Sequence, residues 1–533
     1  MRIHFSSLNR SGLVVVMPLL VSLVGCVRAT PASRDRTAHS SGRGDGGISP
    51  ELRTLIEARI AGVRATEKGI SSMGAVVVGV LRRGEGSFIA AGTRRPGGLL
   101  VDGDTLFKTC SLTKVLTGVL LADAVVRGQV QLSDEAQAHL PGVKLPRHKD
   151  GTIRVEHLAT YSAGFPWQPT NFVGKAAGGY SLEAWRSFLE TFVLPYPPGQ
   201  GFQYGNVGFA LLGDLLAENA AMPLNDLFRK RLFEPLQMRR SGFMGEKPDD
   251  ENRAQGVDAQ GKLVALDRDE PSQPAACALE STARDLMAFL RAHFDKSGPL
   301  YSAMKLALEA RRPGTGSHAG VEMGLGWMLD KNAHIALKTG AIEGYRSVMA
   351  LDLVRENAAV VLAADERVDQ SLLLEDVLLE LARADEKRTQ TTLTAVPQSA
   401  VPFDVKFEDG LRLVGIEAPA EVTLGQDALV RYFYRVEQTP RYEWRAFVHA
   451  DAKGERVKSD HALSRPMSLL LPGALMEDRV KLHFRPGLTN TSFTLFSGFF
   501  RRDKRMTFEP VTEDQRVRGP TIRVVAPASP TAH

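Results

Sequence analysis

Ser111 and Lys114 are a pair whose types and spacing could support covalent chemistry. Residues three apart lie on one face of a helix, so the hydroxyl and the amine would face each other. A serine hydroxyl is a poor nucleophile at neutral pH and needs a base within hydrogen-bond reach. A lysine in apolar surroundings loses hydration, which favours its neutral form. The pair therefore predicts a serine nucleophile with a lysine as candidate base.

The Ser-x-x-Lys spacing occurs twice, so order and context must decide between the matches. Ser302 and Lys305 repeat it, but only Ser111 is followed by both Tyr204-Gly205-Asn206 in a loop and Lys338-Thr339-Gly340 at the end of a strand-like run. Taken singly, each residue has a structural reading: a helix N-cap, a packed aromatic or a surface strand residue. Their joint order favours one catalytic site.

Hydrophobic periodicity indicates the elements that must position these residues. After Ser111 the apolar residues Val115, Leu116, Val119, Leu120, Ala124 and Val125 predict a buried helix over 111–127. Further helices are expected over 181–192, 207–219 and 281–294. Glycine-broken β-rich runs at 73–93 and 324–365 enclose the helices, so we expect one sheet built from both ends of the domain and covered by the helices.

With these three motifs in this order, the sequence resembles the serine β-lactamase, D,D-peptidase and esterase superfamily, in its class C-like branch. Beyond the three motifs, the likeness includes the segments 106–134, 152–166 and 278–290, and it covers nearly all of 48–364. The resemblance implies an α/β (α+β) domain of the β-lactamase/transpeptidase type, with an antiparallel sheet covered by helices.

The resemblance also implies catalytic roles. Ser111 would attack a substrate carbonyl, while Lys114 and Tyr204 would share the proton transfers. Asn206 would hold Lys114 and the substrate amide by hydrogen bonds. Lys338 would pair electrostatically with Tyr204 and help to bind a substrate carboxylate. No metal or other cofactor is expected, since the twelve histidines show no paired metal-ligand spacing.

Substrate binding is implied for the strand end that follows Lys338. Thr339 would contact the substrate carboxylate, Gly340 completes the motif, and the backbone N–H groups of Ser111 and Ala341 would form an oxyanion hole. Candidate substrates are β-lactams, D-Ala peptides of the cell wall and small esters. The alternative is a non-catalytic cell-envelope binding protein that keeps the hydrolase fold and binds through its C-terminal domain.

Three departures from the family pattern leave substrate preference open. Cys110 directly precedes the nucleophile, Gly205 replaces the commoner alanine or serine, and Tyr161-Ser162-Ala163 replaces a more usual His-Thr-Ser. None of the three removes a reacting group.

The N-terminus has the features of an export signal. Arg2 and Arg10 precede the apolar run 12–25, which is long enough for the apolar segment of a signal peptide but short for a membrane-spanning helix. Because the run ends at Cys26 after a small residue, we expect a lipoprotein signal over 1–26 with Cys26 lipidated; the alternative is an ordinary cysteine near a conventional cleavage site. A flexible tether is expected over 27–50. The expected location is the periplasmic side of the cell envelope, at the outer membrane.

The cysteine count leaves a second question open. With Cys26 as a lipid carrier, Cys110 and Cys277 remain. In an oxidising compartment they could form a disulfide, or both could be small buried hydrophobes.

Length and composition set the domain count and exclude one class of partner. A chain of 533 residues exceeds what one hydrophobic core supports, so we expect a hydrolase domain over 51–386 and an all-β sandwich over 397–533. The 66 basic and 61 acidic residues are nearly balanced, so we expect no nucleic-acid partner.

Overall fold

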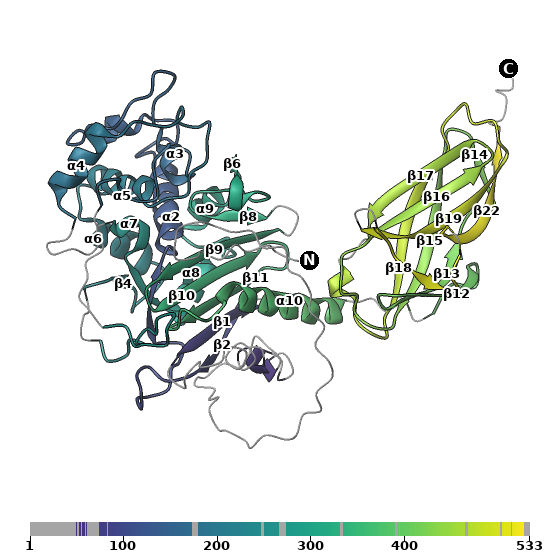
Figure 1. Ribbon diagram of the computed structural model, residues 1–533, viewed down its shortest axis with the longest axis horizontal. Helices are drawn as coiled ribbons and strands as arrows, with labels where there is room; N and C mark the ends of the chain where they lie inside the picture. The colour runs from purple at the N-terminus through teal and green to yellow at the C-terminus, as the bar shows by residue number, and fades with distance from the viewer. Residues whose placement is uncertain are drawn as a thin grey trace. The chain divides into compact units, whose positions relative to one another are not determined.

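The computed structural model describes residues 50–526, apart from 51–52, 55, 59, 61–73, 83, 173–179, 247–249, 266–272, 331–333, 390–392, 394, 464–466, 502–503 and 513. Within these residues the chain divides into two compact units, one ending at Leu381 and the other beginning at Ala382 (Figure 1). The expected signal peptide over 1–26, with Cys26, lies outside the described residues, as does the tether over 27–50 except for Pro50.

An antiparallel sheet of eight strands forms the centre of the first unit, in the order β2-β1-β11-β10-β9-β8-β7-β6. The strands are β1 (Val76–Arg82), β2 (Glu85–Ala91), β6 (Arg312–Pro313), β7 (Glu322–Met323), β8 (Met328–Asp330), β9 (Ile335–Ile342), β10 (Tyr345–Asp352) and β11 (Asn357–Ala363). β1 pairs with β11 over its full length, so the expectation of one sheet from both ends of the domain is confirmed.

Helices gather beside this sheet (Figure 1). They are α2 (Thr113–Val126), α3 (Val155–Ala159), α4 (Leu182–Thr191), α5 (Val207–Ala220), α6 (Leu224–Phe228), α7 (Pro274–Cys277), α8 (Ala283–Ala292), α9 (Tyr301–Ala307) and α10 (Gln370–Thr389), with the short helical turns η1 (Ala136–His139), η2 (Arg229–Phe233) and η3 (Gly316–His318). No single helix among the described residues is long and apolar enough to cross a membrane; α5 and Leu224–Phe233 meet that length and composition only as a pair bent by 79°.

The expected helices are present, but two begin later than the pattern indicated. α2 begins at Thr113 because Ser111 and Leu112 form a turn, and Ser111 is not its N-cap. α8 begins at Ala283 rather than at 281, because the two preceding residues continue a strand and the Thr282 hydroxyl accepts a hydrogen bond from the Asp285 N–H.

A second, small sheet was not expected from the sequence. It has the order β3-β5-β4, from β3 (Leu106–Cys110), β5 (Leu279–Thr282) and β4 (Gly242–Phe243). β3 ends at the residue before Ser111, and β5 follows directly after α7, so this sheet brings two distant segments to the start of α2.

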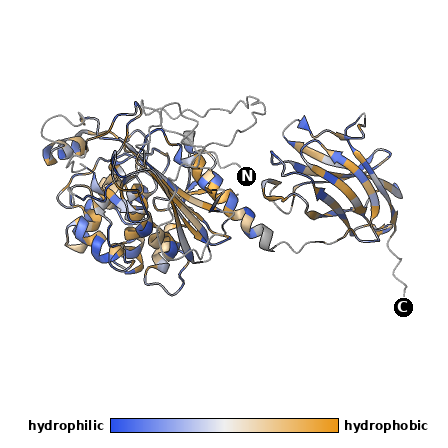
Figure 2. Cartoon of the chain, turned by 90° about the horizontal axis from the view of Figure 1, so that it is seen from below, coloured by the Kyte–Doolittle hydropathy of each residue, from blue (hydrophilic) through white to orange (hydrophobic). Residues whose placement is uncertain are grey.

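The second unit is a β-sandwich, as expected. One sheet has the order β18-β15-β13-β12-β21 and the other β14-β22-β19-β16-β17, with β20 paired to β19. The strands are β12 (Val401–Phe407), β13 (Leu411–Glu417), β14 (Glu421–Thr423), β15 (Asp427–Val436), β16 (Arg445–Ala452), β17 (Glu455–Ala462), β18 (Leu475–His483), β19 (Ser492–Arg501), β20 (Lys504–Arg505), β21 (Phe508–Glu509) and β22 (Val517–Val525). Hydrophobic and hydrophilic residues alternate along the strands in Figure 2, and one buried apolar cluster draws on both sheets.

Candidate active site

Ser111 and Lys114 lie together at the start of α2, as their spacing predicted. Ser111 is a partly exposed residue, whereas the Lys114 side chain is fully buried. Lys114 Nζ lies 3.1 Å from Ser111 Oγ. The buried amine is therefore held within hydrogen-bond reach of a hydroxyl that a substrate can approach.

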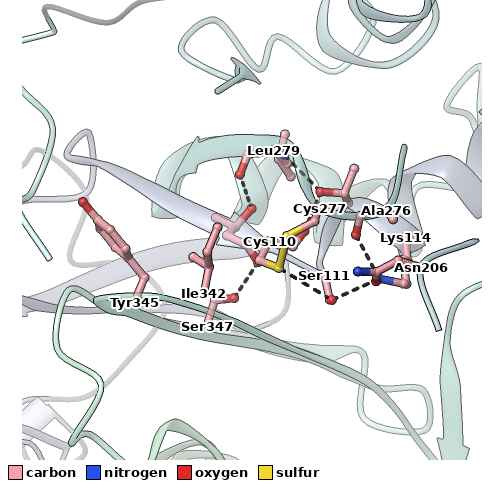
Figure 3. Close-up of a disulfide and its surroundings, with 12 residues drawn as sticks. Cys110, Ser111, Lys114, Asn206, Ala276, Cys277, Leu279, Ile342, Tyr345 and Ser347 are labelled. Carbon is pink, nitrogen blue, oxygen red and sulfur yellow. Dashed lines mark hydrogen bonds between the residues drawn. A yellow bond between two sulfur atoms is a disulfide. The ribbon is translucent and has the colours of Figure 1, made fainter. Parts of the chain in front are cut away.

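Three acceptors surround the Lys114 amine (Figure 3). Besides Ser111 Oγ, Lys114 Nζ donates to Asn206 Oδ1 at 2.6 Å and to the Ala276 carbonyl oxygen at 3.0 Å. An ammonium has three N–H donors and no acceptor, so these partners match its protonated form. Sequence reasoning identified Asn206 but missed Ala276, because a backbone carbonyl leaves no signal in residue type.

Tyr204 and Lys338 form the other half of the site. Lys338 on β9 is fully buried, and its Nζ donates a hydrogen bond of 3.0 Å to the Tyr204 hydroxyl. Lys114 Nζ lies 5.4 Å from the centroid of the Tyr204 ring. The phenol therefore lies between two buried ammonium groups.

These charges set the protonation of the site. Burial alone would raise the pKa of Tyr204, but the charges of Lys114 and Lys338, with hydrogen bonds from Lys338 and Ser111, lower this pKa to about 7. Burial lowers the pKa of Lys114 to about 8, against the opposing effect of Tyr204. Near neutral pH, a Tyr204 phenolate and a Lys114 ammonium can coexist.

The end of β9 runs directly against the end of β3. A Cβ placed on Gly340 would lie 2.2 Å from the Thr109 carbonyl oxygen and 3.3 Å from Ser111 N, so this approach requires glycine. The Ser347 hydroxyl on β10 supports the same carbonyl with a 2.9 Å hydrogen bond. The neighbours Thr339 and Ala341 are partly exposed beside the nucleophile.

Tyr204 is one of four aromatic rings that contact one another in a closed cycle. The Tyr204 ring lies 4.8 Å from Tyr161 and 5.5 Å from His318, which is nearly parallel to it at 11°. Phe202 contacts both of these neighbours, at 5.8 Å from Tyr161 and 5.2 Å from His318. Burial and the charge of Lys338 lower the pKa of His318 to about 4, so its imidazole is neutral at neutral pH. The sequence did not single out Phe202 or His318.

The departure at Gly205 has a physical reason. A Cβ on this residue would lie 2.6 Å from the Pro166 carbonyl oxygen, so the loop leaves no room for the alanine or serine that is commoner in the family pattern. The next residue, Asn206, donates its backbone N–H to the Trp167 carbonyl at 2.9 Å. This close loop packing helps to fix the amide that accepts from Lys114.

Cys110 and Cys277 form a disulfide, with an S–S distance of 2.16 Å. This decides between the two readings that the sequence left open. The second Ser-x-x-Lys match, Ser302 and Lys305, has both side chains exposed on α9. Among the residues that the structure describes, no group of three or more His, Cys, Asp or Glu side chains is arranged to hold a metal ion.

The sheet, its helices and the buried lysines around a serine and a tyrosine define a domain of the β-lactamase/transpeptidase type. The family model described as Beta-lactamase matches residues 60–383. The chain belongs to the Beta-lactamase family, which confirms the resemblance found in the sequence. The sandwich follows the matched residues.

Three curated relatives illustrate the breadth of the match. Protein flp of Staphylococcus aureus (strain MW2) is 22% identical over 268 residues, covering 49% of this chain and 53% of that protein. Beta-lactamase of Escherichia coli (strain K12) is 27% identical over 233 residues, covering 42% and 58%. D-alanyl-D-alanine-carboxypeptidase/endopeptidase AmpH of the same strain is 29% identical over 194 residues, covering 36% and 50%. The chain thus spans about half the length of these relatives.

A solved structure shows the same fold. The Beta-Lactamase/D-Alanine Carboxypeptidase from Pseudomonas syringae superposes with a TM-score of 0.53 at 22% identity, covering 62% of this chain and 98% of that one. The expected β-lactamase/transpeptidase-like fold is therefore confirmed.

Proposed function

We propose that this protein is a serine hydrolase that acts on an amide or ester carbonyl through an acyl-enzyme formed on Ser111. The observation that carries the proposal is the partly exposed residue Ser111, whose Oγ lies 3.1 Å from the amine of the fully buried Lys114, while Asn206 and the Ala276 carbonyl accept from the same amine. Burial of a lysine charge costs free energy of desolvation, so a fully buried lysine beside a serine favours a functional role for the pair.

Tyr204 is the better candidate for the general base. Lys114 Nζ lies within hydrogen-bond distance of Ser111 Oγ, Asn206 Oδ1 and the Ala276 carbonyl, and the three donors of an ammonium match these three partners. Tyr204, with its pKa lowered to about 7, is substantially ionised at neutral pH and shares a hydrogen bond with Ser111. Lys114 then stabilises the phenolate and the developing negative charge.

In acylation, Tyr204 takes the proton from Ser111 Oγ as this oxygen bonds to the substrate carbonyl carbon. The tetrahedral oxyanion would be held by the backbone N–H groups of Ser111 and Ala341. When it collapses, the bond to the leaving amine or alkoxide breaks, and Tyr204 returns the proton to that group. Water, deprotonated by Tyr204, releases the acyl group in the second half-reaction and restores the Ser111 hydroxyl.

Asn206 and the β9 end complete these roles. Asn206 orients Lys114 and would bind a substrate amide, while Lys338 keeps Tyr204 ionised. Lys338 and Thr339 together would bind a substrate carboxylate, and Gly340 permits β9 to approach Ser111.

The candidate substrates are β-lactams, D-Ala peptides of the cell wall and small esters. The first two are supported by the relatives called Beta-lactamase and D-alanyl-D-alanine-carboxypeptidase/endopeptidase. A penicillin contains both an acyl-donor carbonyl and a carboxylate, which suits Ser111 and the cationic Lys338. The partner is therefore a small molecule or a peptidoglycan peptide.

Covalent capture tests the assignment. A labelled penicillin or fluorophosphonate should tag the wild type and a Ser302→Ala control, which removes the exposed copy of the motif, but not Ser111→Ala. Turnover of nitrocefin, p-nitrophenyl acetate and a D-Ala-D-Ala peptide would then identify the substrate class. Tagging of Ser111→Ala would overturn the nucleophile assignment, and a wild type that is neither tagged nor active would favour the binding-protein alternative.

We further propose that the protein is exported and anchored by a lipid on Cys26, facing the periplasm at the outer membrane. The apolar run 12–25 before Cys26 supports this, as does the disulfide, since such bonds persist mainly in oxidising compartments. Labelling with a fatty-acid probe should mark the wild type and fail to mark Cys26→Ser. Equal labelling of both proteins would contradict the lipid anchor.

A further inference from the structure

The disulfide joins two residues that each adjoin a component of the candidate site. Cys110 immediately precedes Ser111, and Cys277 immediately follows Ala276, whose carbonyl accepts from Lys114 (Figure 3). One covalent bond therefore connects the segment that carries the nucleophile to the segment that carries an acceptor for the buried amine.

We propose that the Cys110–Cys277 bridge is a positioning device for acylation, which holds the Ala276 carbonyl on Lys114 and the backbone of Cys110 behind Ser111. This inference rests on the proposed function and adds two residues to it that neither form nor break a bond in the reaction.

Apart from the bridge, noncovalent contacts connect α7 and β5 to the start of α2 and to β3, which pairs with β5 and places Cys110 opposite Leu279. Thr117 Oγ1 donates to the Ala275 carbonyl at 2.7 Å, and the Leu279 N–H donates to Thr113 Oγ1 at 3.0 Å. Thr109 Oγ1 in turn donates to the Leu279 carbonyl at 2.9 Å. These side-chain contacts add to the strand pairing of β3 with β5, but each is a single bond between a small hydroxyl and the backbone. The disulfide is the one covalent connection within this set.

In this proposal the bridge also restrains the backbone conformation of Cys110. Its φ of +46° lies in the left-handed region, which is unfavourable for a residue with a Cβ and persists only where the surroundings enforce it. The Thr113 hydroxyl donates to the Cys110 carbonyl, and the Cys110 sulfur lies 3.8 Å from Ser111 Oγ. Opening the bridge would release this conformation one residue from the nucleophile.

Opening the bridge should lower the pKa of Lys114. If α7 moves away, the ammonium loses one of its three acceptors while remaining fully buried. An unmet donor on a buried charge is costly, so the neutral amine becomes more favourable and the pKa of Lys114 falls below its present value of about 8. A bridge that served stability alone would have no reason to change this pKa.

Reduction of the folded protein tests the inference without a substitution. Dithiothreitol supplies two electrons and two protons to convert the cystine to two thiols, and closes to its own cyclic disulfide. On the substrate that the oxidised protein turns over, we expect kcat/KM to fall at least about tenfold, because an ångström of misplacement is costly in catalysis. The alkaline limb of the pH profile should move to lower pH, and reoxidation should restore both values.

Variants provide the matched control. Cys277→Ala should reproduce the reduced protein, and the double variant Cys110→Ala and Cys277→Ala should show the same loss with no further response to dithiothreitol. If the variants do not fold, reduction and reoxidation of the wild type still give a result. A tagged, active wild type whose rate and pH profile are unchanged by reduction overturns the positioning role, whereas an untagged wild type overturns the proposed function instead. Free Cys110 and Cys277 thiols in the protein purified without reductant would also overturn the positioning role.

Discussion

Lys338 and Tyr204 are joined in two ways: the Lys338 ammonium donates a hydrogen bond of 3.0 Å to the phenol oxygen and lies 4.4 Å from the centroid of the same ring. A phenolate gains from the first contact and from the proximity of the charge. Because Lys338 is fully buried, little water screens the interaction. The strand that carries Lys338 thereby controls the protonation of a residue 134 positions earlier in the chain.

Replacing Lys338 by methionine should remove this control while filling similar space. The pKa of Tyr204 should rise from about 7 towards its ordinary value of 10, so less phenolate is present at neutral pH. We expect kcat/KM at pH 7 to fall by about 10², with partial recovery as the pH is raised. The exposed Lys305→Met is the matched control, and an unchanged acid limb in Lys338→Met would contradict the pairing.

The wild type should have a narrow pH optimum. Activity requires Tyr204 ionised, which develops as the pH rises through about 7, and Lys114 protonated, which is lost as the pH rises through about 8. The profile of kcat/KM should therefore be bell-shaped with its maximum between these values. A rate that continues to rise well above pH 9 would instead indicate that neutral Lys114 is the base.

Two substitutions of Asn206 should move the alkaline limb in opposite directions. Asn206→Ala removes the 2.6 Å acceptor from Lys114 and should lower the pKa of the amine. Asn206→Asp places a negative charge beside the ammonium and should raise it. Measured pH profiles of kcat/KM that shift in the same direction for both variants would rule out this account of Lys114.

Gly205 should tolerate no side chain. In Gly205→Ala the new Cβ would meet the Pro166 carbonyl at 2.6 Å, and we expect a loss of about 1–3 kcal/mol in unfolding free energy from the forced shift. Gly142→Ala is the control, because a Cβ there meets nothing within 4 Å. Urea unfolding of the three proteins measures the difference, and equal midpoints would show that the loop yields freely.

The Tyr161 hydroxyl should be dispensable although its ring is not. The hydroxyl is buried with no hydrogen-bond partner among the described residues, so Tyr161→Phe should leave stability unchanged or raise it by up to about 1 kcal/mol. Tyr161→Leu removes the ring that packs 4.8 Å from Tyr204 and should lower kcat more than KM. A large loss of activity in Tyr161→Phe would reveal a proton-transfer role that the geometry does not indicate.

Local sequence patterns were sufficient to predict the main helices and the large sheet of the first unit. Helical spacing after Ser111 located α2, and glycine-broken β-rich runs at both ends of the unit predicted the large sheet. The order of Ser111, Lys114, Tyr204 and Lys338 predicted that these residues meet, and the structure brings them together.

What sequence reasoning missed depends on tertiary contacts. β3 contains Lys108 and Thr109, polar residues that are buried because β5 pairs beside them and β9 and β10 lie against the same strand. Every residue has a backbone carbonyl, so residue type does not mark the carbonyl of Ala276 as a partner of Lys114. His318 is a single histidine whose position against Tyr204 depends on the path of a distant loop. Cys110 and Cys277 are 167 residues apart, so their pairing could be considered but not decided.

The pairing of β1 with β11 has a consequence for synthesis of the chain. Val76 pairs with Ala91 of β2 on one side and with Ala363 of β11 on the other, so until β11 emerges β1 and β2 form a two-stranded hairpin without the rest of the large sheet, which is marginal in water. The edge of β1 that later pairs with β11 would be exposed to aggregation throughout this interval. Truncation before β11 should therefore yield an insoluble product, even though it leaves Ser111, Lys114, Tyr204 and Lys338 intact.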